Sequence, residues 1–141
     1  MVKLPKEPVK PIGPKCMPLN GSVISEYGMH EHPVLHIMTR NLGAEIRGKK
    51  GEKIKAAAAG TVAMVTEIDG RGPTVILEHE GGVYSVYGHM SAIRVKEGDK
   101  VKNCQDIGTV GDIGSLNGIK LYFQVSEGTD TVDPLQWLRR K

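Results

Sequence analysis

The densest group of potential metal ligands in this chain lies near its start, at His30, Glu31, His32 and His36. Imidazole nitrogens and carboxylate oxygens are common zinc donors in proteins. His30 and His32 are two residues apart, and in a β-strand that spacing places both side chains on the same face. The residue types and their spacing therefore permit a metal site in this segment.

A second group of polar residues alternates with apolar residues near the end of the chain. Lys120, Tyr122 and Gln124 alternate with Leu121, Phe123 and Val125. Successive side chains of a strand point to opposite faces of a sheet. We therefore expect the apolar set to face a core and the polar set to face away from it.

Short runs of β-branched and apolar residues, separated by glycine-containing turns, predict the elements that position these side chains. The clearest runs are residues 61–68, 74–79 and 83–90. Strand signals at this regular spacing are typical of a sheet or barrel. The sequence therefore predicts an all-β fold, mainly antiparallel sheet or barrel-sandwich, with little helix.

The 141 residues fit one folded domain with a single core. Residues 1–18 are interpreted as a Pro-rich basic linker, because four of their prolines recur every third residue, as in polyproline II: Pro5, Pro8, Pro11 and Pro14. The domain is predicted to span residues 19–141.

The net charge of +3 arises entirely from the four lysines and one glutamate of residues 1–18. The remaining chain is neutral, whereas a nucleic-acid-binding domain needs a basic patch on its folded body. Nucleic acid is therefore not a predicted partner. The sequence has no run of 18 apolar residues and no secretory signal, so no membrane span is predicted.

The two cysteines, Cys16 and Cys104, are too few for a disulfide framework. They could pair in an oxidising compartment, or they could remain two unrelated thiols.

Three segments together resemble one family of enzymes. Asn41-Leu42-Gly43-Ala44-Glu45 is similar to the His-x-Gly-x-Asp segment that opens the metal site of the lysostaphin/LytM-type zinc metallopeptidases, peptidase family M23. Tyr87-Gly88-His89-Met90 resembles a second motif of that family, and residues 133–138 resemble its closing segment. The resemblance covers about residues 20–140. It implies the LytM/lysostaphin-like fold, a "duplicated hybrid motif", in a family that cuts peptidoglycan cross-bridges.

The resemblance also places the zinc ligands, and here the residues differ from the family pattern. The three ligand positions fall on Asn41, Glu45 and Tyr122, and the positions of two assisting histidines fall on His89 and Lys120. An amide oxygen is a poor zinc ligand, a phenol has a pKa of about 10, and an ammonium repels a divalent cation. Tight zinc binding needs several donors acting together. We therefore expect no zinc or other cofactor, and no peptidase activity.

The His-rich segment does not replace these ligands in the resemblance. His32 and Pro33 match a loop position of the family that is not a ligand, so metal binding there is not expected. One alternative stays open, a zinc peptidoglycan endopeptidase with atypical ligands such as Glu45, His89 and either His32 or His36.

The same positions raise an electrostatic hypothesis. Lys120 and Glu45 have opposite charges at two positions of the metal site. They could form an ion pair that replaces the charge balance of the metal. Alternatively, both charges could be solvated at the rim of the groove.

Missing zinc ligands are typical of one branch of the family, the EnvC-like and NlpD-like murein hydrolase activators. Their final strand often reads Leu-Tyr-Phe-Glu, which is similar to residues 121–124 here. This resemblance implies a non-catalytic domain that binds and activates a peptidoglycan (N-acetylmuramoyl-L-alanine) amidase during cell-wall remodelling and cell division. It also implies a periplasmic or cell-envelope location.

The resemblance further implies a groove in which the partner binds. The groove would be formed by Asn41, Glu45, His89, Lys120, Tyr122 and Gln124. The alternative to an activator is an inert scaffold that binds peptidoglycan or another envelope protein.

Overall fold

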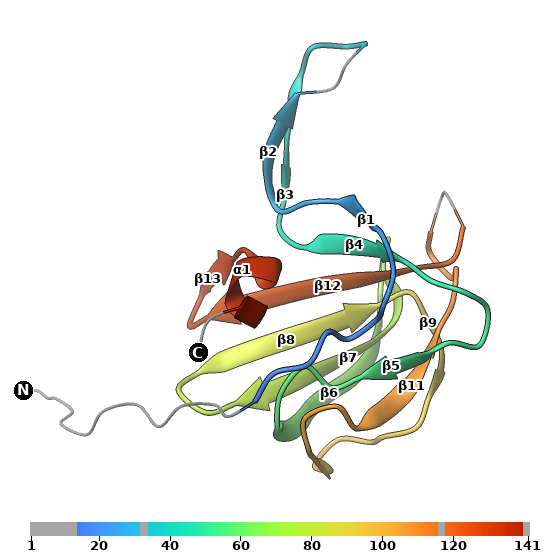
Figure 1. The fold of residues 1–141 in the computed structure, drawn as a ribbon, viewed down its shortest axis with the longest axis vertical. Helices are drawn as coiled ribbons and strands as arrows, with labels where there is room; N and C mark the ends of the chain where they lie inside the picture. Colours follow the sequence, from blue (N-terminus) through green and yellow to red (C-terminus); the bar gives the residue numbers. More distant parts are fainter. Residues whose placement is uncertain (1–13, 32–33, 116–117, 140–141) are drawn as a thin grey trace, which may run out of the picture.

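Short β-strands dominate residues 14–31, 34–115 and 118–139, which are the residues described by the computed structural model (Figure 1). The strands are β1 Val23–Ser25, β2 Gly28–Glu31, β3 Met38–Asn41, β4 Ala44–Arg47, β5 Lys53–Lys55, β6 Gly60–Ile68, β7 Gly72–His79, β8 Val83–Gly88, β9 Met90–Ile93, β10 Lys100–Val101, β11 Asp106–Val110, β12 Lys120–Glu127 and β13 Asp130–Val132. A single helix in these residues, α1, spans Pro134–Arg139. No helix in the described ranges has the length and apolar character needed to cross a membrane. The predicted all-β fold is confirmed.

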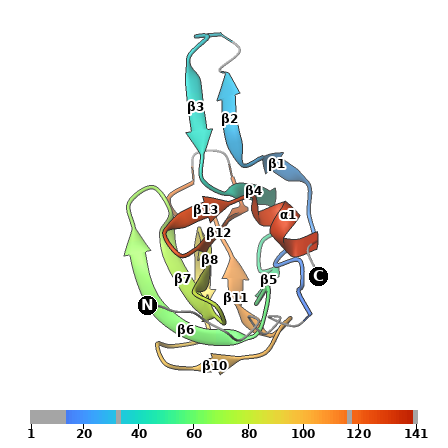
Figure 2. The same cartoon turned by 90° about the vertical axis from the view of Figure 1, so that its left-hand side faces the viewer.

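Antiparallel pairing arranges the strands in three sheets. The largest has eight strands in the order β1-β4-β12-β8-β7-β6-β10, with β13 also paired to β12. A smaller sheet has the order β5-β11-β9, and β2 and β3 form a separate hairpin. Figure 2 shows β5 and β11 beside the large sheet. The core lies between these two sheets and includes Ile54 and Ile107 from the small one and Leu77 and Phe123 from the large one.

The three central strands follow the predicted runs closely, and one boundary differs. β6 and β7 cover the predicted runs 61–68 and 74–79, but β8 ends at Gly88 rather than at residue 90. The cause is His89, whose φ of 63° is left-handed and interrupts the extended backbone. The chain therefore turns at His89 and continues as β9 in the small sheet.

The β2–β3 hairpin projects from the body of the domain (Figures 1 and 2). Its register pairs Met29 with Arg40 and Glu31 with Met38. Both methionines are 57% exposed. Asn41, the first residue of the predicted groove, is the last residue of β3, so the base of the hairpin forms part of the predicted groove.

The segment before β1 is packed onto the domain. Residues 1–13 of the predicted linker lie outside the described residues. Cys16 and Cys104 form a disulfide, which settles the alternative that the sequence left open. Lys15 donates a hydrogen bond from Nζ to the carbonyl of Trp137 at 2.9 Å, and Leu19 is 1% exposed. Residues 15–18, part of the predicted linker, thus contact the folded domain.

Candidate functional site

Glu45 and Lys120 meet where β4 pairs with β12. The register places Glu45 opposite Tyr122, and Lys120 lies two residues away on the same face of β12. Lys120 Nζ is 3.0 Å from Glu45 Oε1, and the two side chains are only 8% and 22% exposed. Of the two alternatives that the sequence left open, the ion pair is therefore the one present, and two solvated charges at the rim are not.

Tyr122 is held by contacts on both its ring and its hydroxyl. Its O–H donates to Gln124 Oε1 at 2.6 Å. The guanidinium carbon of Arg71 lies 3.8 Å from the centre of its ring, in cation–π geometry. Burial raises the pKa of the Tyr122 phenol, so the hydroxyl stays protonated at neutral pH. A protonated phenol whose hydroxyl is already hydrogen-bonded is a poor metal ligand.

His89 lies at the sharp turn between β8 and β9. Its backbone N–H donates to the carbonyl of Arg71, and its Nδ1–H donates to the carbonyl of Ile113 at 2.9 Å. Burial lowers the pKa of His89, and the nearby charges of Lys120 and Arg71 act in the same direction. The imidazole is therefore neutral at pH 7, with Nε2 carrying the lone pair.

Asn41 closes the other side of the site through its side-chain amide. Nδ2 donates to Ser25 Oγ at 2.8 Å and to the carbonyl of Glu26 at 2.9 Å. These two bonds hold the side chain against β1 and the start of the hairpin. Asn41 therefore joins the hairpin to the body of the domain.

The predicted groove residues form one continuous cluster. A pocket of about 150 Å³ is lined by Ser25, Arg40, Asn41, Leu42, Gly43, Glu45, Arg71 and Tyr122. Lys120 joins this cluster through Glu45, and Gln124 joins it through Tyr122. His89 joins it through the backbone of Arg71. Three of the six predicted groove residues thus line the pocket, and the other three, His89, Lys120 and Gln124, are connected to it through neighbouring residues.

Arg71 is the residue farthest in sequence from the predicted positions 41–45 and 120–124 among the pocket-lining residues that sequence reasoning missed, which also include Ser25, Arg40, Leu42 and Gly43. It lies in the β6–β7 turn between Gly70 and Gly72, which have φ values of 79° and 67°. Two glycines flanking an arginine indicate an irregular turn, but they do not show that the side chain reaches β12. That position follows from the stacking of the guanidinium on Tyr122.

The residues at the zinc positions of the family do not fit zinc. No group of three His, Cys, Asp or Glu side chains in the described ranges could hold a metal ion. In the cluster, Glu45 is the carboxylate at these positions, and its oxygen already binds the Lys120 ammonium. A structural or catalytic zinc site needs three or four donors that are free of such partners.

The His-rich segment lies on the β2–β3 hairpin, apart from this cluster. His36 Nδ1 is 2.9 Å from Glu31 Oε2, and His30 Nε2 is 2.9 Å from the carbonyl of Glu26. His32 lies outside the described residues. His30 and His36 therefore both have hydrogen-bond partners close by in the sequence, at Glu26 and Glu31.

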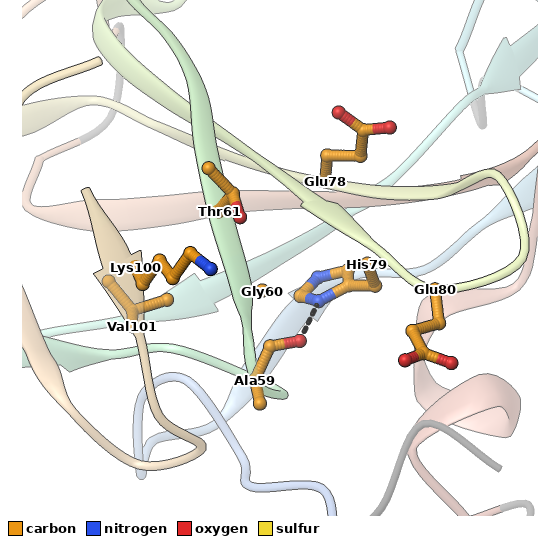
Figure 3. A pocket seen from close by; sticks show the side chains of 8 residues that line it. All are labelled: Ala59, Gly60, Thr61, Glu78, His79, Glu80, Lys100 and Val101. Carbon is orange, nitrogen blue, oxygen red and sulfur yellow. Dashed lines mark hydrogen bonds between the residues drawn. The ribbon is translucent and has the colours of Figure 1, made fainter. Parts of the chain in front are cut away.

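A second pocket lies at the far end of β7, around His79 (Figure 3). His79 uses both ring nitrogens, since Nδ1 is 2.7 Å from the carbonyl of Ala59 and Nε2 is 2.7 Å from Ser85 Oγ. Its imidazole is thus fully engaged in the fold. We assign this pocket no site, because its polar centre has no nitrogen left for a ligand.

The antiparallel sheets match the LytM/lysostaphin-type fold. Residues 39–134 match Peptidase family M23, so the chain belongs to this family. The chain is 32% identical to the Lipoprotein NlpD/LppB homolog of Pseudomonas aeruginosa, over 92% of this chain and 41% of that protein. It is also 32% identical to the Murein hydrolase activator EnvC of Escherichia coli, over 92% of this chain and 30% of that protein.

A solved structure of a protein named as a peptidase has the same fold. The catalytic domain of the antimicrobial peptidase lysostaphin from Staphylococcus simulans has a TM-score of 0.77 against this chain, with 25% identity over 86% of this chain and 94% of that one. The chain spans less than half the length of the two curated relatives above. The family thus includes both peptidases and proteins named as activators.

Proposed function

We propose that this domain is a non-catalytic M23 domain that binds and activates a peptidoglycan amidase, an N-acetylmuramoyl-L-alanine amidase, in cell-wall remodelling and cell division. The proposal rests chiefly on the Lys120–Glu45 ion pair, because it occupies two of the positions that carry the metal chemistry in the family. A site that holds an ammonium there lacks the donors for a zinc-activated water. The groove is then a surface for a partner protein.

The names of the relatives support this function and an envelope location. One relative is named a murein hydrolase activator, and another is named a lipoprotein. The disulfide between Cys16 and Cys104 also suits an oxidising compartment outside the cytosol. We infer that the domain works in the periplasm or cell envelope.

Activation by binding has a thermodynamic requirement. A bound protein shifts its partner's equilibrium only by its difference in affinity for the two states. The groove must therefore bind the amidase more tightly in its open state than in its closed state. The role of this domain is then to present a fixed surface, and the amidase performs the hydrolysis.

A reconstituted assay tests the proposal. Purified domain, an amidase from the same bacterium and dye-labelled sacculi are mixed, and zinc in the domain is measured by mass spectrometry. We expect far less than one zinc per chain, no dye release by the domain alone, and a several-fold increase in release by the amidase. Stoichiometric zinc with dye release by the domain alone would identify a peptidase with atypical ligands.

Two matched variants locate the interaction. Leu42 lines the pocket and is 42% exposed, whereas Met64 on β6 is 45% exposed and does not line it. Leu42→Asp should strongly reduce amidase stimulation, and Met64→Asp should leave it unchanged. Binding to sacculi without any stimulation of the amidase would favour the scaffold alternative instead.

A further inference from the structure

The charges around the groove do not balance. Lys120 and Glu45 neutralise each other. The Arg71 guanidinium stacks on Tyr122, and in the part of the chain that the structure describes no carboxylate forms an ion pair with it. Arg40 adds a second positive charge to the same pocket wall. An anion that enters the pocket therefore meets the Arg71 guanidinium, has the positive charge of Arg40 on the same wall, and finds the Glu45 carboxylate already neutralised.

The size of the pocket limits what this anion can be. Its volume of about 150 Å³ is below the roughly 300–1,000 Å³ of pockets that enclose whole small molecules. It is the size of one side chain or one end group. The planar fork of a guanidinium suits a carboxylate, because the two can form two parallel hydrogen bonds.

The hairpin supplies an apolar strip that leads into the pocket. Met29 pairs with Arg40 across the hairpin, and Met38 lies two residues from Arg40 on the same face. Leu42 continues at the base of the hairpin, where it lines the pocket. An exposed apolar strip of this kind favours a protein segment over the polar sugars of a glycan strand.

We propose that the pocket between Arg71 and Arg40 binds the carboxylate of an acidic side chain, carried by a partner protein segment whose neighbouring apolar residues pack on Met29, Met38 and Leu42. This deepens the proposed function, since the partner there is the amidase. The carboxylate anchors the segment and sets its register, and the apolar contacts bury its flanks.

The first test measures the affinity of the amidase for the domain by calorimetry at low and high salt. Arg71→Glu should weaken binding at least tenfold at low salt, and Arg71→Gln should weaken it by a smaller factor that shrinks in high salt. Lys96→Glu is the control, because it reverses an exposed charge that does not line the pocket. Equal affinity of wild type and Arg71→Glu would overturn the proposal while leaving amidase binding intact.

The second test does not depend on the amidase. The Arg71 Nε–H resonance of a ¹⁵N-arginine-labelled domain is followed while a blocked peptide with one Glu among leucines is added. The Glu peptide should shift this resonance at a concentration at least tenfold lower than its Gln counterpart, and the shift should be absent in Arg71→Gln. If the Glu and Gln peptides shifted the Arg71 resonance at the same concentration, the proposal would be overturned. A shift caused only by a free peptidoglycan stem peptide would overturn it as well.

Discussion

Lys120 brings an ammonium group into a place where only 6% of the residue is exposed. Removing two charges from water costs several kcal/mol per ion, and their attraction offsets this only when the geometry is good. The 3.0 Å contact with Glu45 supplies that geometry. The pair as a whole therefore contributes little net stability, whereas either charge without the other is costly.

A double-mutant cycle on the pair tests this energetic argument. Lys120→Met alone should lower the free energy of unfolding by about 2–4 kcal/mol, because it leaves the Glu45 carboxylate unpaired in a mostly buried position. Lys120→Met combined with Glu45→Gln should recover about 1–2 kcal/mol of that loss. Urea unfolding at pH 7 measures each step, and strictly additive effects would contradict the coupling.

Restoring the ligands of the family should restore zinc. We expect the variant N41H/E45D/K120H/Y122H to retain close to one zinc per chain after dialysis, because imidazoles and a carboxylate then converge on the pocket. The variant N41H/E45D/Y122H keeps the Lys120 ammonium and should retain much less. Metal analysis of both proteins distinguishes the cases. Equal zinc in both would show that the charge of Lys120 does not exclude the metal.

At the scale of single residues, the sequence raised the contact of Lys120 with Glu45 but not the contact of Arg71 with Tyr122. The Lys120–Glu45 pair was one of two alternatives that the sequence left open, because the family resemblance placed two opposite charges at positions of one site without fixing their distance. Arg71 was missed because its role depends on the path of the β6–β7 turn and on the ring of Tyr122. The residue types of positions 69–72 show neither the path of this turn nor how close it comes to Tyr122.

At the scale of elements, strand periodicity predicted β6 and β7 well because each is long and bounded by glycine turns. The end of β8 was predicted two residues too late, since alternation continues through His89 while the backbone does not. The packed segment 15–18 was assigned to the linker because its contacts are with Cys104 and Trp137, far away in sequence. Local composition does not report such long-range contacts.

The disulfide should stabilise the domain through chain entropy. Cys16 and Cys104 are 88 residues apart, so the bond removes much of the freedom of the unfolded chain. The variant C16S/C104S should lose about 2–4 kcal/mol of unfolding free energy. Wild type in reductant should lose a similar amount, and the variant itself should not respond to reductant. An unchanged midpoint in urea for the variant would contradict this account.

At the scale of the whole molecule, one buried chain of hydrogen bonds joins several elements. The Ala57 N–H donates to Tyr87 Oη, the Tyr87 O–H to Ser85, the Ser85 O–H to His79 Nε2, and the His79 Nδ1–H to the carbonyl of Ala59. With a neutral His79 this is the one direction in which every link has a donor and an acceptor, because Nδ1–H donates to the carbonyl and Nε2 can then only accept. A protonated Nε2 would donate to Ser85 and leave one hydroxyl hydrogen of the chain without an acceptor within it. The His79 ring also lies 6.0 Å from that of Trp137, which connects the network to α1.

Acid should therefore destabilise the domain through His79. Burial lowers the pKa of His79 below its usual 6.5, so the folded state favours the neutral ring while the unfolded chain gains a proton as the pH falls through 6.5. This contribution to stability is fully present above pH 6.5 and is lost towards the folded pKa, by up to about 1.4 kcal/mol per pH unit. Burial lowers the pKa of His89 as well, so both histidines act in the same direction.

Urea unfolding between pH 8 and pH 5 measures this dependence. Wild type should be nearly constant from pH 8 to 7 and should lose stability below about pH 6.5. His79→Gln should be less stable at pH 7, because a buried hydrogen-bond chain is disturbed, yet its stability should fall less steeply with acid. His89→Gln removes the other histidine with a lowered pKa and should flatten the remaining slope. If His79→Gln kept the full wild-type slope, the proton taken up on unfolding would belong to another group, and the buried chain would not be the source of the acid sensitivity.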